Sequence, residues 1–141
     1  MSMIRQLSIN DIQFVAHALA EETMRWNEPI PPFHTRYPER LESCLATMAQ
    51  TFDGKPLYPG LVSQGAILFY LLIKNHPFQN GNKRIALTAL LVFLDQNEKW
   101  LNTDEQGLYN FAVWVAGSPA ELKNETVAAV AKFIEKNITR S

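Results

Sequence analysis

The sequence predicts an all-α fold, a compact helical bundle around a central buried helical hairpin. Two segments, residues 61–73 and 85–94, are apolar nearly all round, which in a water-soluble protein marks helices enclosed by other helices. Apolar stripes at helical spacing occur on both sides of this pair and would supply the enclosing helices. A chain of 141 residues, 47% hydrophobic and 19% charged, suits a single domain spanning residues 1–141.

The chain before the hairpin begins with a predicted amphipathic helix over residues 8–26. Ser8 is a suitable N-cap, and the predicted apolar face consists of Ile9, Ile12, Ala16 and Leu19. A proline-rich stretch, residues 27–37, follows as an ordered loop. We interpret His17 as a partly buried helix residue and His34 as an exposed loop residue, and assign neither a function.

A second amphipathic helix leads to a hairpin signal. Pro38 suits a first helical turn, and the helix to residue 50 has an apolar stripe of Leu41, Cys44, Leu45 and Met48. Asp53-Gly54 then predicts a tight β-hairpin between Phe52 and Leu57. The residues alone leave open whether this hairpin only connects two helices or has a function.

The segment after the central pair predicts a brief extended turn over residues 100–103 and two further helices. Thr103 and Gln106 have capping-box spacing, and the next helix has an apolar face of Leu108, Phe111, Ala112 and Val115. Gly117 would end that helix. Ser118 and Glu121 repeat the capping-box spacing before a last stripe of Val127, Val130, Ala131, Ile134 and Ile138.

The polar run between the two apolar segments, residues 75–84, is the candidate functional site. Pro77 biases His76 away from helical backbone angles, so the first central helix should end there. Gly81 supplies unusual backbone angles, and Asn82 is a favourable cap for the second central helix.

Two cations follow in the first turn of the second central helix, where the helix dipole disfavours positive charge. Lys83 and Arg84, together with the unpaired backbone N–H groups of a helix start, therefore predict a phosphate site. His76 lies on the other side of that point and suits general-base chemistry near neutral pH. The phosphate-binding loop of common nucleotide hydrolases, G-x-x-x-x-G-K-[ST], is absent.

The charge and cysteine content of the chain indicate which partners and which cellular compartment to expect. A net charge of −1 and a pI near 6.3 give no electrostatic case for binding nucleic acid or an anionic membrane. The single Cys44 cannot form an internal disulfide, which is compatible with a reducing cytoplasm. No signal peptide is visible and the apolar helices are too short to span a bilayer, so we expect a cytoplasmic protein.

The stretch His76-Pro77-Phe78-Gln79-Asn80-Gly81-Asn82-Lys83-Arg84 resembles the H-x-F-x-[D/E]-G-N-x-R signature of the Fic/Doc superfamily. Most Fic proteins carry Gly at the position of Lys83, so the stretch resembles Doc ("death on curing") proteins more than Fic proteins. The upstream stretch 36–43 resembles the R-D-x-x-L-L-E-S stretch of Doc-like proteins, so the resemblance extends from about Phe33 to Ala116.

The resemblance implies an all-α Fic/Doc fold and a toxin that modifies a protein hydroxyl with ATP and Mg²⁺. It implies His76 as general base, an anion cradle at Gly81 and Asn82, and charge neutralisation by Lys83 and Arg84, with Phe78 anchoring the loop. A Doc-like protein would transfer phosphate to a translation factor such as elongation factor Tu, whereas a Fic protein would transfer AMP. In the family a short flap holds the target by strand addition, and the hairpin residues Phe52, Asp53, Gly54 and Lys55 would form it here.

One departure from the family pattern bears on activity. Asn80 stands where the family has Asp or Glu to hold the metal, and a neutral amide oxygen binds Mg²⁺ more weakly than a carboxylate. A weakened or inactive anion-binding module is therefore an alternative to phosphoryl transfer and to AMP transfer. The inhibitory [S/T]-x-x-x-E-[G/N] helix of Fic proteins is not matched by Thr35–Arg40, which predicts a separate small antitoxin partner.

Overall fold

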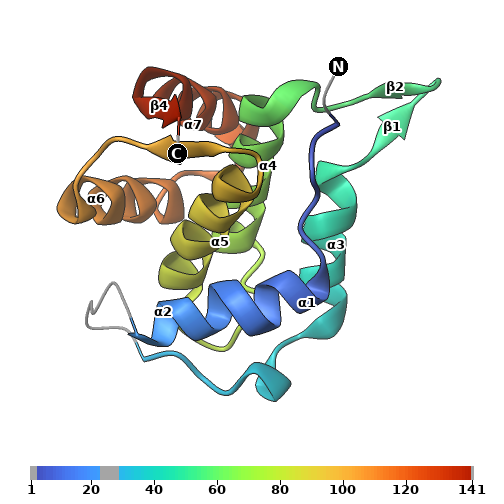
Figure 1. The fold of residues 1–141 in the computed structure, drawn as a ribbon. Coiled ribbons are helices and arrows are strands. Elements are labelled where there is room, and N and C mark those ends of the chain that lie inside the picture. Colours follow the sequence, from blue (N-terminus) through green and yellow to red (C-terminus); the bar gives the residue numbers. More distant parts are fainter. Residues whose placement is uncertain (1–2, 23–28, 141) are drawn as a thin grey trace.

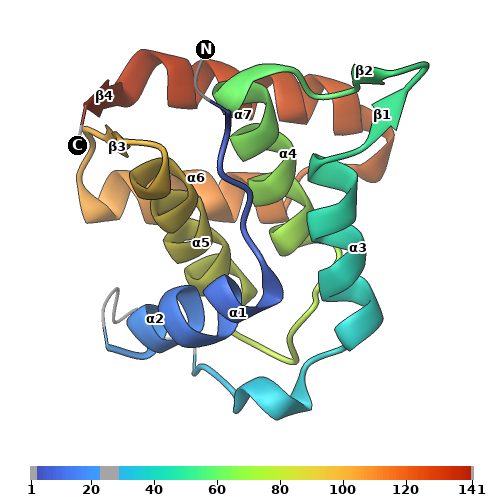
Figure 2. The same cartoon turned by 45° about the vertical axis from the view of Figure 1, so that its right-hand side comes forward.

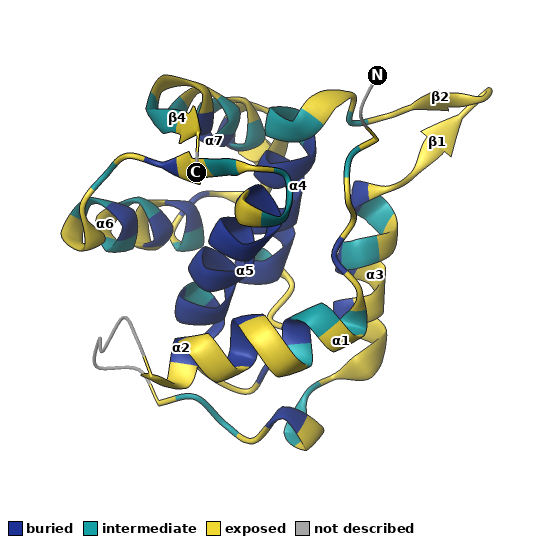
Figure 3. Cartoon of the chain, viewed as in Figure 1, coloured by how far each residue is buried: buried dark blue, intermediate teal, exposed yellow. Residues whose placement is uncertain are grey.

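The computed structural model describes residues 3–22 and 29–140, and they fold around two antiparallel central helices (Figure 1). These are α4 (Gly60–Lys74) and α5 (Asn82–Gln96). All residues from 64 to 73 and from 84 to 94 are buried, and Figure 3 shows this as a continuous dark region through the middle of the molecule. The predicted all-α fold with a central buried hairpin is confirmed.

The other helices enclose the central pair on opposite sides (Figure 2). The N-terminal helical segment comprises α1 (Ile9–Asp11), a π-helical stretch (Ile12–His17) and α2 (Ala18–Glu22), and it packs against α5. Helix α3 (Pro38–Met48) packs against α4. Helix α6 (Glu105–Ala116) contacts both central helices, and α7 (Lys123–Asn137) packs along α4. Short 3-10 turns occupy Phe33–Thr35 and Ala120–Leu122.

Two small strand pairs complete the described chain. Strands β1 (Thr51–Phe52) and β2 (Lys55–Pro56) form the predicted hairpin, with Asp53 at φ 53° and Gly54 at φ 77°. Positive φ at both central residues matches the right-handed twist of the flanking strands. Strand β3 (Lys99–Leu101) pairs with β4 (Ile138–Arg140), so an extended segment after α5 is joined to the end of the chain.

The N-terminal helix departs from the predicted face because of its π-helical stretch. The predicted cap is present, with Ser8 and Asp11 forming a capping box. Since i→i+5 bonding places more residues in each turn than an α-helix does, Ala20 replaces Leu19 on the buried face. Leu19 is 40% exposed, so its predicted core position was wrong. The end of the predicted helix, residues 23–26, lies outside the described residues.

Three predictions in the C-terminal half were also wrong. The cap of α6 is Asp104, which accepts from the Gly107 N–H at 2.6 Å, in place of the Thr103 capping box. Ser118 does not cap a helix, because its hydroxyl donates back to the Val115 carbonyl at 2.6 Å. Ile138 lies in β4 rather than on the last helical stripe, since pairing with β3 ends α7 at Asn137. No helix within the described ranges has the length and apolar character needed to cross a bilayer.

Candidate active site

The polar run forms the loop between the C-terminal end of α4 and the N-terminal end of α5. His76 is exposed, whereas Pro77 and Phe78 behind it are buried. His76 has φ 47°, in the left-handed region, whereas the following proline by itself favours extended angles. This conformation costs a residue with a side chain about 1–2 kcal/mol, so the surrounding structure must hold it.

Two hydrogen bonds from the start of α3 hold the backbone beside His76. The Tyr37 N–H donates to the Pro77 carbonyl at 2.8 Å, and the Arg40 guanidinium donates to the His76 carbonyl at 3.2 Å. Arg40 itself lies over the Tyr37 ring, 4.3 Å from its centroid. The loop is therefore fixed from a segment that lies about forty residues earlier in the sequence.

Asn82 braces the loop from within. Its amide donates to the Phe78 carbonyl at 2.9 Å, and its side-chain oxygen accepts from the Phe78 N–H at 3.0 Å. The prediction that Asn82 caps α5 was wrong, because both of its polar groups are used on Phe78 and the N-cap position is Gly81. Asn82 is 8% exposed, so these bonds are shielded from water.

Phe78 anchors the loop in the core, as expected. Its ring centroid lies 5.8 Å from that of His17 and 5.9 Å from that of Phe33. His17 is buried, with one ring nitrogen 2.9 Å from the Pro31 carbonyl and the other 3.0 Å from a Glu21 carboxylate oxygen. The first helix, the proline-rich loop and the motif thus meet at one aromatic cluster.

Gly81 is required by both its conformation and its surroundings. It adopts φ 72°, and a Cβ at this position would come within 2.6 Å of the Ile30 Cδ1 atom and 2.9 Å of the Pro29 carbonyl oxygen. Its N–H donates to the Asn80 side-chain oxygen at 2.7 Å. The turn that begins α5 therefore depends on the positive φ of Gly81 and on the hydrogen bond from its N–H to the Asn80 side chain.

The two cations of the motif lie in different environments. Lys83 is half-buried in the first turn of α5. Arg84 is buried, and its guanidinium donates to the Ala20 carbonyl in the last turn of α2. A cation at the negative end of a helix is favourable, so α2 supplies a structural reason for Arg84 that does not require a bound anion.

The side chains of the motif loop offer few ligands for a metal ion. Among the described residues, no group of three or more His, Cys, Asp or Glu could hold an ion. The Asn80 oxygen is neutral and already accepts the Gly81 N–H, which leaves one further lone pair for a ligand. The residues of this site therefore do not fit a protein-held Mg²⁺.

The predicted target-docking hairpin lies far from His76. Residues 51–56 precede the start of α4 and His76 follows its end, so they lie at opposite ends of this helix (Figure 1). A helix of 15 residues is about 22 Å long. Phe52 is 75% exposed at that remote end. The structure brings together residues 76–84 but does not bring Phe52, Asp53, Gly54 and Lys55 to them.

A feature that sequence patterns did not indicate adjoins the motif instead. Glu39, Arg40, Ser43 and Asn75 line an open hollow of about 360 Å³ directly before His76. Behind it, burial raises the pKa of the Cys44 thiol to about 11, so this cysteine is not a nucleophile near neutral pH. Three of the four lining residues fall in the stretch 36–43 that resembles the Doc-like pattern, but that pattern did not place them beside His76.

Comparison with models of protein families matches residues 6–94 to the Fic/DOC family. A search of curated proteins and a search of solved structures found no match. The matched range covers more than half of the chain and includes the N-terminal helical segment, α4, the whole motif loop and α5 as far as Leu94. The chain therefore belongs to the Fic/DOC family of protein-modifying transferases.

Proposed function

We propose that this protein is a Doc-like toxin that transfers the γ-phosphoryl group of ATP to a hydroxyl of a target protein. The observation that carries the proposal is His76, an exposed imidazole fixed in a left-handed backbone beside the N-terminal end of α5. Lys83 in the position where most Fic proteins have Gly favours phosphoryl transfer over AMP transfer.

The residues of the loop suit the proton and charge movements of that reaction. His76 accepts the proton of the target hydroxyl while the oxygen of that hydroxyl forms a bond to the γ-phosphorus. The bond from the γ-phosphorus to the bridging oxygen breaks, and ADP leaves. The first N–H groups of α5 and the Lys83 ammonium offset the phosphate charge. Arg84, buried in the first turn of α5, adds a fixed positive charge behind the phosphate position.

The metal would be held mainly by the nucleotide. Bound Mg²⁺ supplies charge neutralisation between neighbouring phosphates. The chain offers it one neutral oxygen, that of Asn80, and this oxygen is shared with the Gly81 N–H. We therefore expect a high magnesium requirement and slow turnover relative to family members with an acid at this position.

The target and the regulator follow from the same proposal. A translation factor such as elongation factor Tu is the target that the Doc-like motif implies, and a small antitoxin protein is the expected partner. The hollow beside His76, lined by Glu39, Arg40, Ser43 and Asn75, is where a target segment could approach the imidazole. The hairpin would contribute to docking only for a target that also reaches the far end of α4.

A second candidate function is an anion-binding module that no longer transfers a group. The amide at Asn80 favours it, because it replaces the negative charge that would hold the metal, and the bond of Arg84 to the Ala20 carbonyl gives this cation a structural role without a bound phosphate. In this case ATP binds through the N-terminal end of α5, and His76 has no role in chemistry.

Intact-mass spectrometry of elongation factor Tu incubated with the protein and Mg-ATP tests the proposal. A phosphate-sized gain that disappears with His76→Ala and persists with His34→Ala is expected. His34 is a matched control because it is also an exposed loop histidine. An AMP-sized gain contradicts phosphoryl transfer, and an unchanged mass together with calorimetric ATP binding supports the second candidate.

A further inference from the structure

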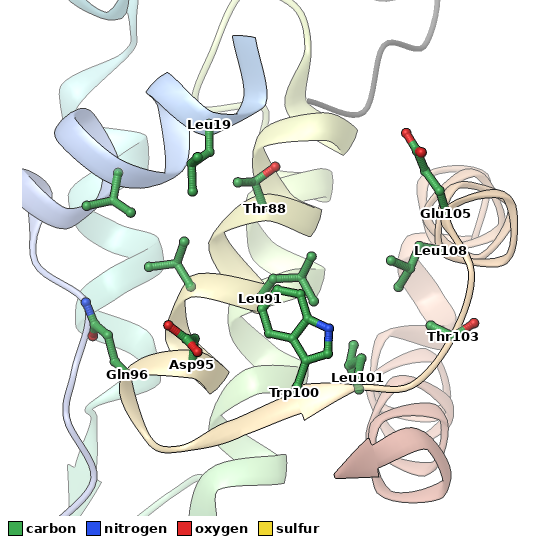
Figure 4. Close-up of a pocket in the computed structure, with 12 residues that line it drawn as sticks. Leu19, Thr88, Leu91, Asp95, Gln96, Trp100, Leu101, Thr103, Glu105 and Leu108 are labelled. Carbon is green, nitrogen blue, oxygen red and sulfur yellow. The ribbon is translucent and has the colours of Figure 1, made fainter. Parts of the chain in front are cut away.

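A groove separate from the motif lies over the second half of α5. It has a volume of about 710 Å³ and lies between the N-terminal helix and α6, with β3 along one end (Figure 4). Its floor is apolar and includes Leu91 of α5, Leu101 of β3 and Leu108 of α6, all buried. Figure 4 shows the Trp100 indole extending from β3 over this floor.

The rim of the groove is acidic. Asp95, near the end of α5, and Glu105, at the start of α6, are both exposed and contribute carboxylates from opposite sides. None of the described residues that line the groove is Lys, Arg or His. Neither carboxylate takes part in an ion pair with a described residue. An apolar hollow with two carboxylates that no described cation pairs with, and with one indole, complements a ligand that is apolar along its body and cationic at one end.

We propose that this groove binds a small organic cation with an aromatic or aliphatic body. The volume falls within the range of about 300–1,000 Å³ that small-molecule sites occupy. The strand β3 lies across one end, so the groove suits a compact ligand better than a long continuous helix. The body of the ligand packs on Leu91 and Leu108 against Trp100, and the cation lies at the acidic rim, beside Asp95 or Glu105.

The site is independent of the transfer reaction. The groove shares α5 with the motif, but its lining begins at Thr88, one turn after Arg84. No residue assigned to phosphoryl transfer lines it. An absence of transferase activity would therefore not count against ligand binding in this groove. An absence of ligand binding would not count against the transfer reaction.

Three probes of similar size and different charge test the proposal on the full chain. They are naphthylethylamine, naphthylethanol and naphthylacetate, measured by calorimetry and by the shift of the Trp100 indole N–H signal in nuclear magnetic resonance. A Trp100→Phe variant assigns that signal among the three tryptophans of the chain. We expect the amine to bind roughly tenfold more tightly than the alcohol, and the acetate not to bind.

A matched pair of charge variants completes the test. Asp95→Asn with Glu105→Gln should weaken the amine to the affinity of the alcohol, whereas Glu125→Gln with Glu135→Gln on α7 should leave it unchanged. All four carboxylates are exposed, and circular dichroism checks that both variants fold. Equal binding of amine and alcohol, or no binding of any probe, overturns the proposal. A concentration-dependent dimer abolished by Leu19→Glu also overturns it, because the groove would then hold a second copy of the chain.

Discussion

Replacing Asn82 with alanine tests how the motif loop is held. Asn82 makes two hydrogen bonds to the backbone of one residue, donating to the Phe78 carbonyl at 2.9 Å and accepting from the Phe78 N–H at 3.0 Å. Both bonds are buried, and the Phe78 side chain is 1% exposed. Removing the amide therefore leaves a donor and an acceptor without partners in a place that water does not reach.

The expected loss in the free energy of unfolding follows from the two Phe78 backbone groups that lose their partners. A buried polar group that loses its partner costs about 1–3 kcal/mol, so two cost about 2–6 kcal/mol. Alanine has a higher helix propensity than asparagine, which returns about 0.5 kcal/mol. We expect Asn82→Ala to lower the free energy of unfolding by about 2–5 kcal/mol.

Urea denaturation followed by circular dichroism measures this loss. Asn124→Ala is the matched control, since Asn124 is an exposed residue near the start of α7 and its replacement should change stability by less than about 0.5 kcal/mol. Equal effects of the two substitutions would show that Asn82 does not brace the loop. In that case the fixed position of His76 would need another cause.

Three further predictions concern the same end of the molecule. Gly81→Ala should destabilise the protein by about 2–5 kcal/mol, because alanine is strained at positive φ and its Cβ would meet Ile30; a loss below 1 kcal/mol in urea denaturation speaks against this. Asn80→Asp should raise the transfer rate most at limiting magnesium, and a rate independent of the substitution at every magnesium concentration contradicts the role of the missing acid. The raised pKa of Cys44 means that its neutral thiol stabilises the folded state fully below about pH 9 and that this contribution is lost as the pH rises towards 11. Wild type should therefore lose about 2 kcal/mol more than Cys44→Ala between pH 8 and 11, and parallel pH profiles would refute the shift.

The sequence was sufficient for features that depend on neighbouring residues. The all-round apolar segments predicted α4 and α5 because only enclosed helices tolerate such composition. Asp53-Gly54 predicted a hairpin because both residues accept positive φ, which the structure shows. The break after α4 and the turn at Gly81 followed from proline and glycine in the same way.

Features that depend on distant parts of the chain were not predictable. The bond of Arg84 to the Ala20 carbonyl could not be read from local spacing, because the two residues are 64 positions apart. Ile138 was placed on a helix because its pairing with Leu101 cannot be read from local spacing. The π-helical stretch moved Leu19 out of the core by adding a residue to one turn, which no simple periodicity contains. The roles in a reaction of the six predicted site residues of the loop stay predictions: His76, Asn80, Gly81, Asn82, Lys83 and Arg84.

The central claim is that His76 activates a hydroxyl for attack on the γ-phosphorus of ATP. The most direct measurement incubates the protein with a bacterial lysate and ATP radiolabelled at either the γ- or the α-phosphate, and follows label on protein. We expect label from the γ-phosphate alone, lost with His76→Ala and retained with His34→Ala. Label from the α-phosphate, or γ-label that survives His76→Ala, would contradict it.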